Sequence, residues 1–146
     1  MTPSSADAAD SVLTGSCLCG GVRVTLTGAP SDVTLCHCTT CQKTSGGAFA
    51  VAVGSLPSQL RLDDPSGALT FWQSGPETRR SFCRQCGTPV GFHYDDPSRD
   101  RITVWRGLFD DPSTLVPTGQ IWTDSRPGWV CRLDDLPGHP KGAKLP

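Results

Sequence analysis

The sequence predicts one mainly β domain with many loops, built as coiled antiparallel sheets. Glycine and proline contribute 16 and 13 of the 146 residues, so turns should be frequent and long helices rare. Short segments that alternate apolar and polar residues recur between clusters of Pro, Gly, Asp and Ser, as half-buried strands do. A chain of this length forms one modest core.

The expected strands follow one another along most of the chain. In the first, Val22, Val24 and Leu26 alternate with polar residues after the Gly20-Gly21 turn, so the cysteines just before that turn should lie at a strand end. Six further strands are expected at residues 48–53, 68–72, 79–82, 89–94, 101–105 and 120–123. Only residues 39–45 look helical, and the glycines at 46 and 47 should end that helix.

The two ends of the chain lack periodic apolar residues. Residues 1–12 are therefore predicted to be a disordered N-terminus, residues 13–136 the single domain, and residues 137–146 a flexible tail. No N-terminal segment has the charge and apolar run of a signal peptide, and no run approaches the length of a membrane span. These features favour a cytoplasmic protein.

The charge pattern argues against two classes of partner. The formal net charge is -1, and the sequence contains no run of Lys or Arg. Phosphate backbones and anionic membrane surfaces both require clustered positive charge. We therefore expect no nucleic-acid partner and no membrane partner; the oligomeric state is not indicated.

Seven of the eight cysteines occur in groups with the spacing of metal ligands. In a chain without an export signal, such clustering favours metal binding over disulfides. Cysteine pairs separated by one or two residues can hold one zinc ion from a single turn, and two such pairs complete a tetrahedral site. The groups are Cys17 and Cys19, then Cys36, Cys38 and Cys41, then Cys83 and Cys86, with Cys131 alone.

The spacing favours a division into four and three ligands without imposing it. Both pairs are followed by glycine, which lets backbone amides turn toward the sulfurs, so we expect the two pairs to share one closed structural site. The middle group could instead lend two ligands to either neighbour. By itself it supplies three thiolates and leaves a fourth position open, as catalytic zinc sites do. A second structural site completed by His37, His93 or Cys131 is an alternative.

Three sequence motifs resemble those of a known family. They read GSCLCGGVRV at 15–24, LCHCTTCQKTSGGAF at 35–49 and FCRQCGTPV at 82–90. In this order they resemble glutathione-dependent formaldehyde-activating enzymes and centromere protein V. The resemblance implies a β-tent fold of several coiled sheets around a Cys₄ zinc site. It implies that Cys17, Cys19, Cys83 and Cys86 are structural zinc ligands, and that Cys36, Cys38 and Cys41 are metal ligands of the catalytic site.

The resemblance also implies an activity. The family reaction is the reversible addition of glutathione to formaldehyde, which makes these proteins carbon-sulfur lyases. We therefore expect a zinc-dependent lyase or synthase that handles a thiol adduct of a small aldehyde or another electrophile. A non-catalytic zinc scaffold and a thiol redox sensor are the alternatives. One departure stands out, because Gln120 occupies a position where family members often carry a histidine.

Several other residues have less specific patterns. Between two expected ligands, His37 should face solvent or support the site, whereas His93 should be an ordinary strand residue. Cys131 should be a small buried residue. Thr44, Ser45 and the two following glycines could offer donors to substrate, and Lys43 and Arg126 could pair with a substrate carboxylate. The four tryptophans should mostly fill the core, with Trp122 and Trp129 the candidates for a pocket.

Overall fold

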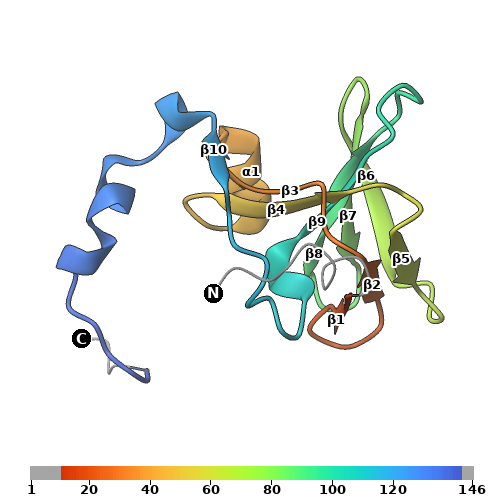
Figure 1. Cartoon of the computed structure of the whole chain (residues 1–146), viewed down its shortest axis with the longest axis horizontal. Helices are drawn as coiled ribbons and strands as arrows, with labels where there is room; N and C mark the ends of the chain where they lie inside the picture. Colours follow the sequence, from red (N-terminus) through yellow and green to blue (C-terminus); the bar gives the residue numbers. More distant parts are fainter. Residues whose placement is uncertain (1–10, 143–146) are drawn as a thin grey trace.

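The computed structural model describes residues 11–142, and two sheets of mostly antiparallel strands form its body (Figure 1). The smaller sheet has the strand order β1-β2-β5. It consists of β1 (Val12–Ser16), β2 (Arg23–Thr27) and β5 (Leu60–Asp63). The larger sheet has seven strands in the order β10-β3-β4-β9-β8-β7-β6. These are β3 (Asp32–Cys36), β4 (Ala50–Ser55), β6 (Leu69–Gly75), β7 (Thr78–Cys83), β8 (Pro89–Tyr94), β9 (Ile102–Trp105) and β10 (Gly119–Ile121).

The mainly β prediction is confirmed, and each expected segment contains or adjoins a strand. The match is closest at β8, whose bounds are those expected, while β10 ends at Ile121 because Thr123 begins a 3-10 turn. Three strands were not expected, namely β1, β3 and β5. Each has only four or five residues, and none shows a regular alternation of buried and exposed positions. Val12, assigned to the N-terminal tail, is the first residue of β1.

The predicted helix is confirmed as α1 (Thr39–Ser45). The Cys38 side chain accepts a hydrogen bond from the Cys41 amide and so caps the helix N-terminus. Gly46 follows in the left-handed conformation, and its N–H donates to the Gln42 carbonyl. The helix is therefore bounded by a cysteine of the middle group at one end and by a glycine at the other.

The two faces of the larger sheet have different roles. Val33, Val53 and Val104 are paired across β3, β4 and β9, and all three are buried in the core shared with the smaller sheet. In the neighbouring register positions, Ala52 is paired with Trp105, and both belong to a second cluster around Cys36 and Cys41. The pleat therefore separates a structural face from a face that carries the middle cysteine group.

An ion pair crosses the sheet close to this second face. Asp32 on β3 accepts from Arg101, with Nη2 and Oδ2 2.9 Å apart, and the second guanidinium nitrogen contacts the other carboxylate oxygen. The pair passes over Gly54 on β4, which lies opposite Asp32. A Cβ atom on Gly54 would overlap the Arg101 guanidinium and come within 2.5 Å of the Asp32 carboxylate. Only glycine leaves room for this contact.

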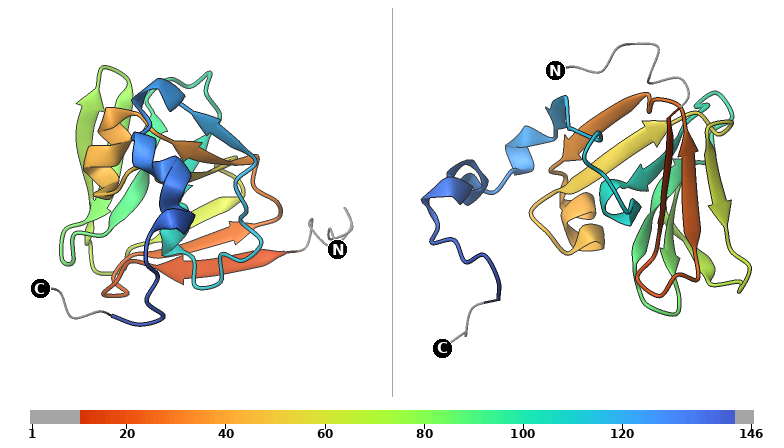
Figure 2. Two further views of the ribbon diagram at one scale, coloured as in Figure 1. Left: turned by 90° about the vertical axis from the view of Figure 1, so that its left-hand side faces the viewer. Right: turned by 60° about the horizontal axis from the view of Figure 1, so that its bottom comes forward.

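The C-terminal part of the chain runs back along the edge of the larger sheet and then leaves it. β10 pairs in parallel with β3, which places Ile121 opposite Cys36. Two 3-10 segments follow, η2 (Thr123–Ser125) and η3 (Gly128–Asp135), and they project away from the sheets as an arm (Figures 1 and 2). Cys131 is exposed on this arm, so the expectation that it is buried is wrong.

The disordered ends remain a prediction, whereas the expectation about the tryptophans is met only in part. Residues 1–10 and 143–146 of the predicted tails lie outside the described part of the chain. Of the four tryptophans, Trp105 is buried, whereas Trp72, Trp122 and Trp129 are exposed, so the core prediction fails for three of them. They lie at a sheet edge or on the C-terminal arm, where no second layer covers them. Among the described helices, none is long and apolar enough to cross a membrane.

We expect Gly54→Ala to destabilise the fold. The added methyl group must displace the Arg101 and Asp32 side chains, which should lower the free energy of unfolding by about 1–3 kcal/mol. Urea denaturation of the metal-loaded protein measures this effect. Gly107→Ala is the matched control, since its added Cβ meets nothing within 4 Å and should leave stability unchanged. Equal stability of the two variants would contradict the steric argument.

The Asp32–Arg101 pair also predicts a pH dependence. The hydrogen bond from Arg101 lowers the pKa of Asp32 below its ordinary value of 3.8. The ion pair therefore contributes fully to the free energy of unfolding above the ordinary pKa of Asp32, and this contribution is lost as the pH falls through the lowered pKa. Asp32→Asn should be less stable than the wild type at pH 6, and this difference should shrink as the pH falls toward 2. Denaturation curves measured at matched pH values test this, and a constant difference would contradict it.

Candidate functional site

Seven cysteines form two separate clusters, divided as four and three. Within each cluster the sulfur atoms all lie within 4.8 Å of one another. All eight cysteines of the chain are free thiols. The spacing left open which groups share a site. In the structure the two cysteine pairs form one cluster, and the middle group lends no ligand to either pair. The clusters are Cys17, Cys19, Cys83 and Cys86, and Cys36, Cys38 and Cys41.

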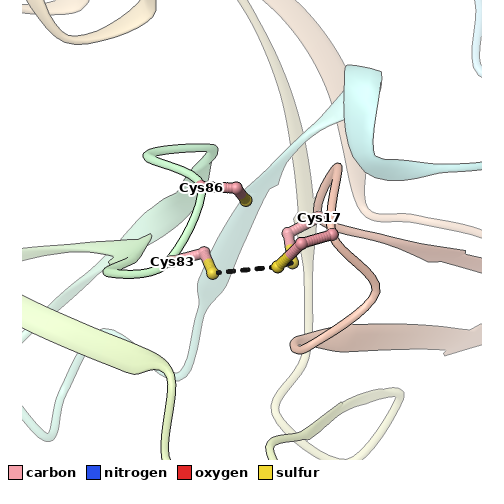
Figure 3. A group of neighbouring side chains, drawn as sticks. Cys17, Cys83 and Cys86 are labelled. Atoms are coloured by element: carbon pink, nitrogen blue, oxygen red, sulfur yellow. Dashed lines mark hydrogen bonds between the residues drawn. The ribbon is translucent and has the colours of Figure 1, made fainter.

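The four-cysteine cluster joins the two sheets. Cys17 and Cys19 lie in the turn from β1 to β2, Cys83 ends β7, and Cys86 lies in the turn to β8. Figure 3 shows Cys17 facing Cys83 and Cys86 across the gap between these two turns. The Cys19 sulfur is 3.6 Å from that of Cys17 and 3.7 Å from that of Cys83. Sulfurs around a tetrahedral zinc ion lie about 3.8 Å apart, so the donor set fits this metal.

Backbone and hydroxyl groups turn toward these sulfurs, as the glycines predicted. Gly20 and Gly87 have φ angles of +76° and +75°, which only glycine adopts readily. Beyond the first turn the Val22 amide donates to the Cys17 sulfur at 3.3 Å, and beyond the second the Thr88 hydroxyl lies 3.2 Å from the Cys86 sulfur. Such donors stabilise thiolates, and hence the form that binds metal.

The thiols of this cluster differ in their pKa values. Hydrogen bonds from the Thr88 side chain and amide lower the pKa of Cys86 to about 5. A hydrogen bond from the Gly21 amide favours the Cys19 thiolate, yet the neighbouring Cys17 and Cys86 raise its pKa to about 12. Adjacent thiolates repel each other. A divalent metal ion would offset this repulsion and let all four sulfurs ionise.

The three-cysteine cluster is built where β3 meets α1. Cys36 ends the strand, Cys38 caps the helix, and Cys41 lies in its first turn. The Cys36 and Cys38 sulfurs are 3.6 Å apart, and the Cys41 amide donates to the Cys38 sulfur at 3.3 Å. Burial raises the pKa values of Cys36 and Cys41, whereas for Cys38 the hydrogen bonds outweigh burial and lower it. The spacing again fits a metal held by three thiolates.

No fourth protein ligand completes this cluster among residues 11–142. Within this range, no other His, Cys, Asp or Glu joins Cys36, Cys38 and Cys41 as a possible metal ligand. The alternative of a structural site completed by His37, His93 or Cys131 is therefore not supported by the geometry. Cys36 also lines a cavity of about 530 Å³, together with Thr34, Ala52, Phe92 and Ile121. Three thiolates would leave one position of a tetrahedral metal ion free, and the cavity lies beside one of these ligands.

His37 is fully buried, which corrects the expectation that it could face solvent. Its Nε2 lies 3.0 Å from Oε1 of Gln120, the residue found where the family often has histidine. Its Nδ1 is buried without a hydrogen-bond partner in the described chain. Gln42, which sequence reasoning missed, donates to the carbonyls of His37 at 2.7 Å and Ser125 at 2.9 Å. Gln120 thus ties β10 to the cysteine loop, and Gln42 ties the segment after β10 to it.

The remaining candidates occupy varied positions. His93 is a half-buried strand residue, as expected, with its ring 5.6 Å from that of Phe71. Arg126 lies 3.4 Å from the Gln120 oxygen, and Lys43 is exposed. Thr44 lines a second, smaller cavity, which also contains Arg80. Arg80 was not anticipated, since an arginine on an alternating strand carries no motif of its own.

Comparisons with known proteins agree with this geometry. The chain resembles a crystal structure described as a Rhodobacter sphaeroides protein from a structural genomics programme, with 25% sequence identity and a TM-score of 0.56. The match covers 73% of this chain and 98% of that one. No curated protein sequence matches the chain. The family model for glutathione-dependent formaldehyde-activating enzymes matches residues 12–125, which include both cysteine clusters. The chain therefore belongs to the glutathione-dependent formaldehyde-activating enzyme family.

Proposed function

We propose that this protein is a zinc-dependent carbon-sulfur lyase or synthase that adds a thiol of the glutathione type to a small aldehyde and reverses that addition. In this proposal Cys17, Cys19, Cys83 and Cys86 hold a structural zinc ion. Cys36, Cys38 and Cys41 hold a second, catalytic zinc ion. The family supports the reaction class, and the cytoplasm supplies both glutathione and a reducing environment for free thiols.

The observation that carries the proposal is the contrast between the two clusters. Four sulfurs fill a tetrahedral shell, whereas three leave one position free. The three-sulfur cluster adjoins the cavity of about 530 Å³, which falls within the range of small-molecule sites. A scaffold role would need no such vacancy beside a cavity. The arrangement therefore favours an enzyme that admits a ligand at the second cluster.

The reaction itself needs no oxidant or further reactant. A bound zinc ion would lower the pKa of an incoming thiol and hold it as a thiolate. The sulfur then forms a bond to the aldehyde carbon, the carbonyl π bond breaks, and the proton lost by the thiol ends on the new hydroxyl oxygen. The product is a hemithioacetal, and cleavage is the reverse. The protein contributes chiefly by holding the two reactants together.

The chain's own residues suit this role. Ala52 and Trp105 are buried beside the cluster, and Phe92 packs against it, so these apolar side chains exclude water from one side of the site. Ile121 borders the cavity from the opposite strand, β10. The contacts of Gln42 and Gln120 with His37 fix the loop between Cys36 and Cys38. These contacts therefore hold the three-cysteine cluster next to an apolar wall.

Metal content should separate the two clusters. We expect the purified wild type to contain two zinc ions and Cys38→Ser to contain one while remaining folded, because the four-cysteine cluster is intact. Cys83→Ser should unfold, since it removes a link between the two sheets. Elemental analysis with circular dichroism measures both effects. Cys131→Ser, which alters an exposed cysteine outside both clusters, should keep two zinc ions. Equal loss of structure in Cys38→Ser and Cys83→Ser would contradict the division of roles.

Activity should depend on the open cluster. We expect the wild type to accelerate exchange between formaldehyde, glutathione and their adduct, measured by NMR exchange spectroscopy, and Cys38→Ser to show only the uncatalysed rate. Cys131→Ser should match the wild type. A cobalt-substituted sample should also change its visible spectrum when glutathione is added. An unchanged exchange rate and a spectrum insensitive to thiols would overturn the proposed function.

A further inference from the structure

A second cavity lies beside the three-cysteine cluster, between α1 and the β6–β7 hairpin. It has a volume of about 180 Å³ and is lined by Thr44, Trp72, Arg80 and Trp105, among others. Trp105 also belongs to the buried cluster that contains Cys36 and Cys41, so this cavity borders the residues packed around the three-cysteine cluster. A cavity of this size is smaller than the roughly 300 Å³ typical of whole-ligand sites. It suits a single chemical group of a larger molecule.

Arg80 is the charged residue in this cavity, and its hydrogen-bonding capacity is unused. Two of its guanidinium nitrogens, Nε and Nη1, are buried and have no hydrogen-bond partner among the described residues. The guanidinium carbon stands 5.2 Å from the centre of the Phe92 ring, which supports the charge from one side. The third nitrogen, Nη2, is not among the buried unpartnered atoms.

Neighbouring arginines differ from Arg80 in having acidic partners. On the same strand, Arg79 pairs with Asp95 at 2.6 Å, and Arg101 pairs with Asp32. None of the ion pairs formed by residues 11–142 includes Arg80. A guanidinium without an acidic partner can donate a charge-assisted hydrogen bond to a carboxylate. The cavity therefore has the chemistry of a carboxylate site.

Phe92 lies between Arg80 and the larger cavity. Its ring contacts the Arg80 guanidinium, and it also lines the larger cavity that contains Cys36. Phe92 and Trp105 pack against each other, with ring centres 5.7 Å apart. The larger cavity is also lined by Arg99 and Arg101, each of which pairs with an aspartate, so among the arginines that line these two cavities Arg80 alone has no acidic partner.

We propose that Arg80 binds a carboxylate of the thiol substrate and makes the site selective for thiols that carry one. The ligand's identity as a thiol rests on the proposed function, whereas the carboxylate site rests on the geometry around Arg80. Neutral thiols of similar size would lose the charge-assisted hydrogen bonds and bind more weakly.

Calorimetric titration of the zinc-loaded full chain tests this with three probes: glutathione, its diethyl ester and S-methylglutathione. The wild type should bind the two free acids at least roughly 10-fold more tightly than the ester. Arg80→Gln should remove that preference by weakening the acids alone, and Arg80→Lys should restore part of it through its charge. Arg79→Gln is the matched control, being the same substitution on the same strand at an arginine that already has a partner.

Equal affinity of the wild type for acid and ester would overturn the proposal, as would no detectable binding of either acid. Equal weakening of acid and ester by Arg80→Gln would do the same. Should Arg80→Gln fail to fold, the acid-to-ester ratio of the wild type against Arg80→Lys still decides. S-methylglutathione has no thiol to react. Suppose that S-methylglutathione binds in an Arg80-dependent manner, while the protein does not accelerate formaldehyde–glutathione exchange and glutathione does not change the cobalt spectrum. The proposed function then fails and the carboxylate site stands.

Discussion

The meeting of four sulfurs between two turns is the constraint on which the rest of the structure depends. One turn belongs to the smaller sheet and the other to the larger one, so a metal held there links the sheets at a point where each has reversed direction. Short strands of three to seven residues supply little stability of their own. A metal-linked crossing would compensate for this, since metal binding free energy becomes folding free energy when the site exists only in the folded state.

That link leaves the larger sheet free to serve two purposes. One face packs against the smaller sheet through Val33, Val53 and Val104. The other face is not needed for the main core, and it carries Cys36, Trp105 and Phe92 around the open cluster. Because successive strand residues point to opposite faces, the same short strands provide both the core and the candidate site. The Asp32–Arg101 ion pair across Gly54 then fixes the far side of this face.

Sequence reasoning succeeded where the chemistry is local. The cysteine spacing, the glycines after each pair and the helix between 39 and 45 depend on a few adjacent residues, and the structure agrees with each of them. It failed where the outcome depends on distant partners. β3 was not expected because its pattern is irregular, and it is a strand because β4 and β10 flank it. Arg80 and Gln42 have no local signature, and the cavity and the hydrogen bonds that give them significance exist only once the sheets have assembled.

The parallel pairing of β10 with β3 has a consequence for the order in which the molecule is assembled. His37 and Gln120, which meet beside the open cluster, are 83 residues apart in the chain. During synthesis the four-cysteine cluster emerges well before β10. It could therefore bind a metal ion while the loop around Cys36 still lacks β10 beside it. Cys36, Cys38 and Cys41 would therefore be the last of the clustered thiols to be covered as the fold assembles.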